Sequence, residues 1–102
     1  MADLDLKQND TASVEATLPD DLTDATEVRF QLSESAGGDA VIDSVAVIQN
    51  ASEGIVRYDW SNGETDKTGL YYLEWRVEWS DGNIETYPKD GYSSVYFHRD
   101  QQ

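Results

Sequence analysis

The residues that could carry out chemistry are few, and the first is the single histidine, His98. Ser93 and Ser94 precede it on the same short apolar-polar stretch, and a serine beside a histidine could form a nucleophile and its general base. A catalytic arrangement also needs a third group that orients the histidine, and no candidate for it is evident. We therefore interpret His98 as a histidine on a partly exposed strand. One histidine without any cysteine also makes a zinc site improbable.

Carboxylates are the second group of candidates, because the chain has 21 Asp and Glu residues. Asp59, Glu64 and Asp66 lie close in sequence, as do Asp81 and Glu85, and such oxygen ligands bind calcium. Neither stretch has the full spacing of a calcium-binding loop. Paired acids also hydrolyse glycosidic bonds when they lie about 5–10 Å apart, but an acidic surface produces such pairs without function. The sequence therefore predicts no catalytic residue, metal ligand or cofactor.

Aromatic side chains could form a third kind of site, a platform on which a sugar ring stacks. Along residues 70–79, Tyr71, Trp75 and Trp79 alternate with polar residues and share their face with apolar ones, which favours core packing. An exposed coplanar aromatic pair would instead favour a carbohydrate-binding module. The predicted core contains Phe30, Tyr71, Leu73, Trp75 and Val77.

The charge balance narrows the possible partners. The formal net charge is −14, from 21 acidic and 7 basic residues. Self-repulsion of this size destabilises a compact state, and molar salt screens it to within roughly 3 Å. We therefore expect a protein of a halophile with a salty cytoplasm. Nucleic acid and anionic membranes are not expected partners, because both bind clustered Lys and Arg.

Alternation of apolar and polar residues dominates the chain and predicts short strands separated by turns. The expected strands cover residues 14–18, 28–32, 41–49, 56–60, 70–79, 84–87 and 93–99. Asp43 and Ser44 suggest a break or bulge inside the third, and residues 80–83 (SDGN) predict a hairpin turn. The expected fold is an all-β, immunoglobulin-like antiparallel β-sandwich of about seven strands. It forms one domain, residues 1–102, with tails at about 1–8 and 99–102.

A local pattern supports the immunoglobulin-like interpretation. Tyr71 lies two residues before Leu73, which is the spacing of the tyrosine corner relative to the cysteine of strand F. Phe30 would take the place of the core tryptophan of strand C. The first residues have neither the basic nor the apolar segment of a signal peptide, and no apolar run approaches the roughly 20 residues of a membrane helix. We expect a protein made in the cytoplasm that stays there or enters an assembly.

Residues 54–92 resemble a known family through six runs, GIVRYDW at 54–60, ETDKTGLY at 64–71, EW at 74–75, DG at 81–82, ETYP at 85–88 and GY at 91–92. The pattern is similar to the N-terminal β-sandwich domain of phage baseplate upper proteins and to small related virion proteins of tailed viruses. The resemblance implies an immunoglobulin-like fold within a virus particle. Baseplate upper proteins continue into long receptor-proximal regions that are absent here, which argues against a receptor-carrying role.

These observations together predict a non-enzymatic virion structural protein of a halophilic tailed virus, assembled in the host cytoplasm. A tail, baseplate or neck component is expected, with a capsid decoration protein as the alternative and a carbohydrate-binding module as the alternative of another class. The expected partners are other virion proteins and copies of the same chain, without nucleic acid or membrane. The candidate interface residues are Leu4, Leu6, Gly37, Gly38, Tyr96 and His98.

Overall fold

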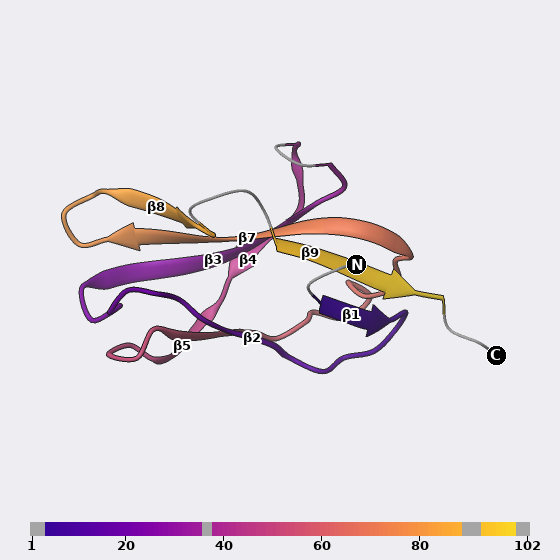
Figure 1. Ribbon diagram of the computed structural model, residues 1–102, viewed down its shortest axis with the longest axis horizontal. Helices are drawn as coiled ribbons and strands as arrows, with labels where there is room; N and C mark the ends of the chain where they lie inside the picture. Colours follow the sequence, from indigo (N-terminus) through magenta and orange to yellow (C-terminus); the bar gives the residue numbers. More distant parts are fainter. Residues whose placement is uncertain (1–3, 36–37, 89–92, 100–102) are drawn as a thin grey trace.

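The computed structural model describes residues 4–35, 38–88 and 93–99, and these form nine β-strands and no helix. In chain order the strands are β1 (Leu4–Lys7), β2 (Val14–Thr17), β3 (Ala25–Ser33), β4 (Ala40–Val45), β5 (Val47–Asn50), β6 (Ile55–Tyr58), β7 (Gly69–Trp79), β8 (Ile84–Tyr87) and β9 (Ser93–His98). They build an elongated sandwich of two sheets (Figure 1) with extents of 47 × 24 × 21 Å. The predicted all-β, immunoglobulin-like sandwich is confirmed.

The larger sheet has six strands in the order β1-β9-β7-β3-β4, with β8 also paired to β7. The smaller sheet has three strands in the order β2-β6-β5. All pairings are antiparallel except that of β1 with β9, which is parallel. The long strand β7 pairs with β3 on one side and with β8 and β9 on the other, so it fixes the position of most of the sheet.

The core lies between the sheets and follows from the alternation of β3 and β7. Phe30 pairs in register with Trp75, and both are buried because their side chains point to the same face of the larger sheet. From the smaller sheet, Tyr58 stacks on Phe30 with ring centroids 4.2 Å apart and planes 1° from parallel. Leu73 and Val77 are also buried. These contacts pack the two sheets against each other.

The side of the sandwich formed by residues 40–50 differs from the prediction. We predicted one strand over 41–49 with a break at Asp43 and Ser44, but both residues lie inside β4. The break occurs at Ala46, where the chain leaves the larger sheet and enters the smaller one as β5. Ala46 is buried, and its small side chain fits the crossing between the sheets. The bulge of this strand pair lies earlier, where Ser33 pairs with Ala40.

Two further features correct the sequence analysis. The predicted N-terminal tail contains β1, in which Leu4 and Leu6 pack against the core while Asp5 is exposed. Tyr71 is only half-buried, since it lies near the start of β7, and it packs edge-on against Phe97 at a centroid distance of 5.4 Å. Burial raises the pKa of its hydroxyl.

The predicted hairpin after Trp79 is confirmed by the pairing of β7 with β8.

Within the described residues, no helix is long and apolar enough to cross a membrane.

Candidate interaction surface

His98 lies exposed on the outer face of the larger sheet, and its Nε2 is 2.9 Å from Oδ1 of Asp5 on the neighbouring strand β1. Ser94 is four residues away on the same strand, which corresponds to about 13 Å at the rise of an extended chain. Ser93 is one residue further. Neither hydroxyl can be activated by the imidazole over that separation, because a nucleophile and its base must be within hydrogen-bond reach. The geometry instead makes His98 and Asp5 a surface pair.

The carboxylates at 59, 64 and 66 do not converge on a shared cation position. Glu64 accepts hydrogen bonds from the Tyr58 hydroxyl at 2.6 Å and from the backbone N–H of Ser61 at 2.7 Å. Asp59 accepts a hydrogen bond from the Ser13 hydroxyl at 2.6 Å, which lowers the pKa of its carboxyl group. The hydrogen bonds of Asp59 and Glu64 therefore hold the connection between β6 and β7 in place.

The carboxylates at 81 and 85 lie near the β7–β8 hairpin, beside an open pocket that Trp79 and Asp24 also line. Asp81 accepts hydrogen bonds from the backbone and side-chain N–H groups of Asn83, both at 3.0 Å, and so closes the turn. Throughout the described part of the chain, no group of three or more His, Cys, Asp or Glu side chains is arranged to hold a metal ion.

The aromatic residues do not form a sugar-stacking platform. Trp75 is buried in the core, and Trp60 packs edge-on against Phe30 while its indole N–H donates to the Ala12 carbonyl at 2.9 Å. The exposed pair of Tyr96 and His98 has ring planes inclined at 52°. A sugar face needs an open, flat aromatic surface, so the feature that would favour a carbohydrate-binding module is not present among the described residues.

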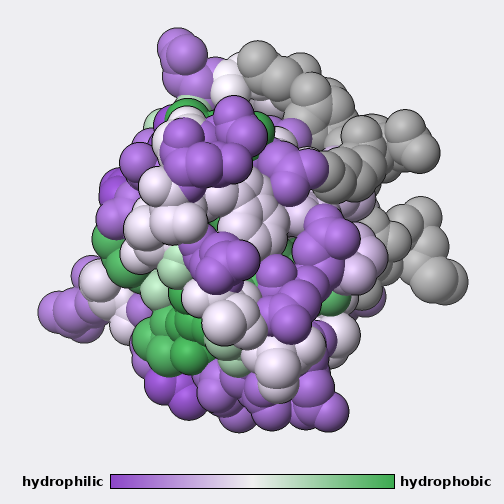
Figure 2. All heavy atoms as spheres, turned by 90° about the vertical axis from the view of Figure 1, so that its left-hand side faces the viewer, coloured by the Kyte–Doolittle hydropathy of each residue, from purple (hydrophilic) through white to green (hydrophobic). Residues whose placement is uncertain are grey.

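What the surface does offer is a small set of exposed apolar side chains. The end of the molecule that faces the viewer in Figure 2 is mostly hydrophilic, with a hydrophobic area at its lower left. In the described residues, the large apolar side chains that are exposed are Val41, Val45, Val47, Leu70, Ile84 and Tyr96. They fall into two main groups, one on β7 and β9 of the larger sheet and one on the edge strands β4 and β5, and Ile84 stands apart on β8.

The first group, which we call the Tyr96 patch, consists of Leu70, Tyr96 and His98 on the outer face of β7 and β9. Leu70 and Tyr96 are paired across the strands and are 44% and 40% exposed. The ring of Tyr96 contacts that of His98 with centroids 4.7 Å apart. The structure thus brings together two of the predicted interface residues, Tyr96 and His98.

The other predicted interface residues lie elsewhere. Leu4 and Leu6 turn inward from β1 and are half-buried against the core, so they contribute little to an outer surface. Gly38 lies in the connection between β3 and β4, where its N–H donates to the Ser35 carbonyl at 2.9 Å, away from the Tyr96 patch. Gly37 lies outside the described residues.

The second group, which we call the valine edge, consists of Val41, Val45 and Val47. They are 48%, 58% and 41% exposed and follow the open side of the sandwich along β4 and β5. Sequence analysis missed this surface, because valines in an alternating strand predict a buried face. The signal available was the composition of the segment, since apolar residues occur on both faces of the strand, with Ile42 buried and Val41 and Val45 exposed.

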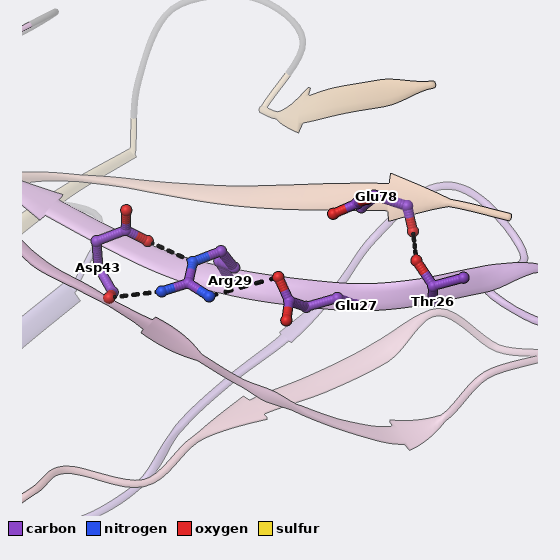
Figure 3. A network of polar contacts seen from close by, with 5 residues as sticks. All are labelled: Thr26, Glu27, Arg29, Asp43 and Glu78. Atoms are coloured by element: carbon purple, nitrogen blue, oxygen red, sulfur yellow. Dashed lines mark hydrogen bonds and ion pairs between the residues drawn. The ribbon is translucent and has the colours of Figure 1, made fainter. Parts of the chain in front are cut away.

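The valine edge is held in place by Arg29 on the neighbouring strand β3 (Figure 3). Its guanidinium bonds Asp43 twice, through Nε to the carboxylate Oδ1 at 2.7 Å and through Nη2 to the backbone carbonyl at 2.9 Å. A third, longer contact of 3.4 Å reaches Glu27. The hydrogen bond from Arg29 lowers the pKa of the Asp43 carboxyl group and raises that of the guanidinium. These contacts hold β4 in place at Asp43, which lies between Val41 and Val45.

Comparison with known proteins identifies a fold relative. No protein-family model matches the chain. No curated protein is significantly similar to it in sequence. The crystal structure of CopC from Methylosinus trichosporium OB3b is similar over 100% of this chain and 89% of that chain, with a TM-score of 0.63 and 17% sequence identity. At that identity the likeness shows a shared β-sandwich fold.

The comparison contradicts the function predicted from sequence. The structure that this chain resembles over its whole length, CopC, does not fit a structural role in a virus particle. The prediction of a virion component, whether tail, baseplate, neck or capsid decoration, is therefore wrong. Short runs of strand and turn residues recur in β-sandwiches of unrelated function, so the runs within 54–92 are a weak guide to what the protein does.

Proposed function

We propose that this protein is a non-enzymatic interaction domain that associates with copies of itself through exposed apolar residues of its edge strands. The observation that carries the proposal is the valine edge, in which Val41, Val45 and Val47 are exposed along β4 and β5, strands that each have one unpaired side. An exposed apolar strand edge is a template for pairing with another chain, and most proteins blunt such edges. A domain that keeps one in the native state has a use for it.

The arrangement of the polar side chains also supports a binding role over an enzymatic one. In the described residues the histidine is paired with Asp5 on the surface, and the acids at 59 and 64 bond neighbouring groups of the fold. The pocket beside the β7–β8 hairpin is lined by the Ser80 hydroxyl and three carboxylates, with neither a histidine nor a lysine among its lining residues. The exposed valines are hydrophobic groups without reactive atoms, so their chemistry is that of contact.

The net charge determines the conditions for such contact. Two copies that each carry a charge of −14 repel one another in dilute buffer. At ~1 M salt the screening length falls to ~3 Å, so the repulsion is confined to charges in direct contact while hydrophobic burial persists. Self-association should therefore strengthen as the salt concentration rises, as expected for a protein that works in high salt.

The test is the molar mass of the full chain in solution. Sedimentation equilibrium should be run on the wild-type protein in KCl from about 0.1 M to about 3 M, a range that spans the screening argument. We expect monomers at low salt and dimers or larger species at high salt. A monomer at every salt concentration, with the fold verified by circular dichroism, would refute the proposed function.

A further inference from the structure

We infer that the self-association pairs β4 with β4 of a second copy, antiparallel about a two-fold axis through Asp43, so that the two larger sheets become continuous. The inference rests on the proposed function, because it names the surface and the geometry of that association. Three independent features of the valine edge support it: the length of the free strand, the direction of its backbone groups and its self-complementarity.

The first feature is strand length. The described strands with an unpaired side are β1, β2, β4, β5 and β8. Among them β4 has six residues and each of the others has four. A longer edge forms more backbone hydrogen bonds with an added strand, and it carries two of the exposed valines. The pairing ends at Val45, because the next residue takes the chain into the smaller sheet.

The second feature is the direction of the backbone groups. The Ala46 N–H donates to the Val28 carbonyl at 2.8 Å, so this residue directs its polar groups toward β3. In an antiparallel pair these groups alternate in direction from one residue to the next. Val45 and Asp43 therefore point their N–H and C=O away from β3, toward the open side. The Asp43 carbonyl also bonds Arg29, and its second lone pair can accept a bond from another strand.

The third feature is self-complementarity. With the axis at Asp43, Val45 of one copy lies opposite Val41 of the other, and the same pair repeats on the far side of the axis. Cross-strand pairs of β-branched residues stabilise a sheet. The two Asp43 side chains would meet at the axis, where like charges are unfavourable, but each is already paired with its own Arg29 at 2.7 Å. Salt screens the repulsion that remains between the two Asp43 side chains.

Cysteine cross-linking provides a direct test, since the natural chain contains no cysteine. Opposed residues of a hydrogen-bonded antiparallel pair have Cα atoms about 5.5 Å apart, within the roughly 4.4–6.8 Å range of a disulfide. The Asp43→Cys variant should therefore form a disulfide-linked dimer in high salt. The control is Ile84→Cys, which is also an exposed position on an edge strand. It should remain largely unlinked.

A second pair of variants keeps the test independent of disulfide chemistry. Val45→Lys places a charge on the edge, and it acts twice in a two-fold dimer, so self-association should weaken by at least about tenfold. Ile84→Lys makes the same change at a similarly exposed residue and should leave self-association unchanged. If the wild type associates while Val45→Lys associates equally well and Asp43→Cys does not cross-link, this inference fails and the proposed function stands. If the wild type is a monomer in all salt concentrations, the proposed function itself fails.

Discussion

Replacement of Phe30 by alanine should destabilise the fold more than almost any other single change. Its ring is fully buried and stands at the centre of the contact between the two sheets. It stacks on Tyr58 at 4.2 Å and meets the edges of Trp60 and Trp75 at 5.4 and 5.2 Å. Truncation would therefore leave a cavity bounded by three aromatic rings, which cannot collapse without moving both sheets.

The magnitude follows from burial and from the ring contacts. Phenylalanine to alanine in a core costs about 3–5 kcal/mol, and the aromatic contacts place Phe30 in the upper part of that range. The total stability of a domain is about 5–15 kcal/mol, so the variant would lose a large fraction of it. Phe30→Leu keeps most of the apolar volume and loses the stacking, so we expect a smaller cost of about 1–2 kcal/mol.

The assay is urea unfolding at constant high salt, followed by the fluorescence of the tryptophans around the site. Wild type, Phe30→Ala and Phe30→Leu would be compared at one protein concentration, with Ile84→Ala as an exposed control that should change stability by less than about 0.5 kcal/mol. A loss below about 1 kcal/mol for Phe30→Ala would refute the argument that this ring joins the two sheets.

Three further predictions follow from local geometry. Gly54 has φ +74°, and a Cβ added there would lie 2.5 Å from a backbone oxygen. Gly63 has a similar φ of +84° but open space around it. Gly54→Ala should therefore lower the thermal midpoint clearly more than Gly63→Ala does. Tyr58→Phe removes the 2.6 Å hydrogen bond to Glu64 and should cost about 1 kcal/mol in urea unfolding; an unchanged midpoint would contradict this. The pKa of Asp59 is lowered by a serine hydroxyl, so its stabilising effect is present above the unfolded pKa of about 4 and is lost as the pH falls through the folded value. Urea midpoints of wild type and Asp59→Asn should therefore converge on acidification, and a constant difference would refute the assignment.

The strands were largely predictable because their signal is local. Apolar residues at every second position identify the buried face of β7 and β3, and the buried residues Phe30, Trp75 and Val77 lie on those faces. The turn at residues 80–83 was equally readable, since Asp and Gly in that order favour a tight hairpin. The acidic composition likewise needs no structure to be interpreted.

The candidate site was less predictable, because it depends on which strands remain unpaired. Val41 and Val45 alternate with the buried Ile42 and therefore lie on the outer face of β4, but the open side of β4 exists only because this strand ends up at the margin of its sheet. The guanidinium of Arg29 reaches Asp43 across 14 positions of sequence, a contact that requires the register of β3 with β4. The function inferred from short sequence runs was wrong because such runs specify strands and turns, which many sandwiches share.

The sequence alone determined the all-β class, the two-sheet core and the strong negative charge, since these depend on residue type and on spacing along the chain. Only the tertiary structure decided that the chain changes sheets at Ala46, that β1 joins the larger sheet beside β9, and that β4 is left with an open side. The physical reason is that strand pairing is a choice among distant segments. Local alternation defines two faces for each strand and contains no information about which neighbour, if any, satisfies its edge.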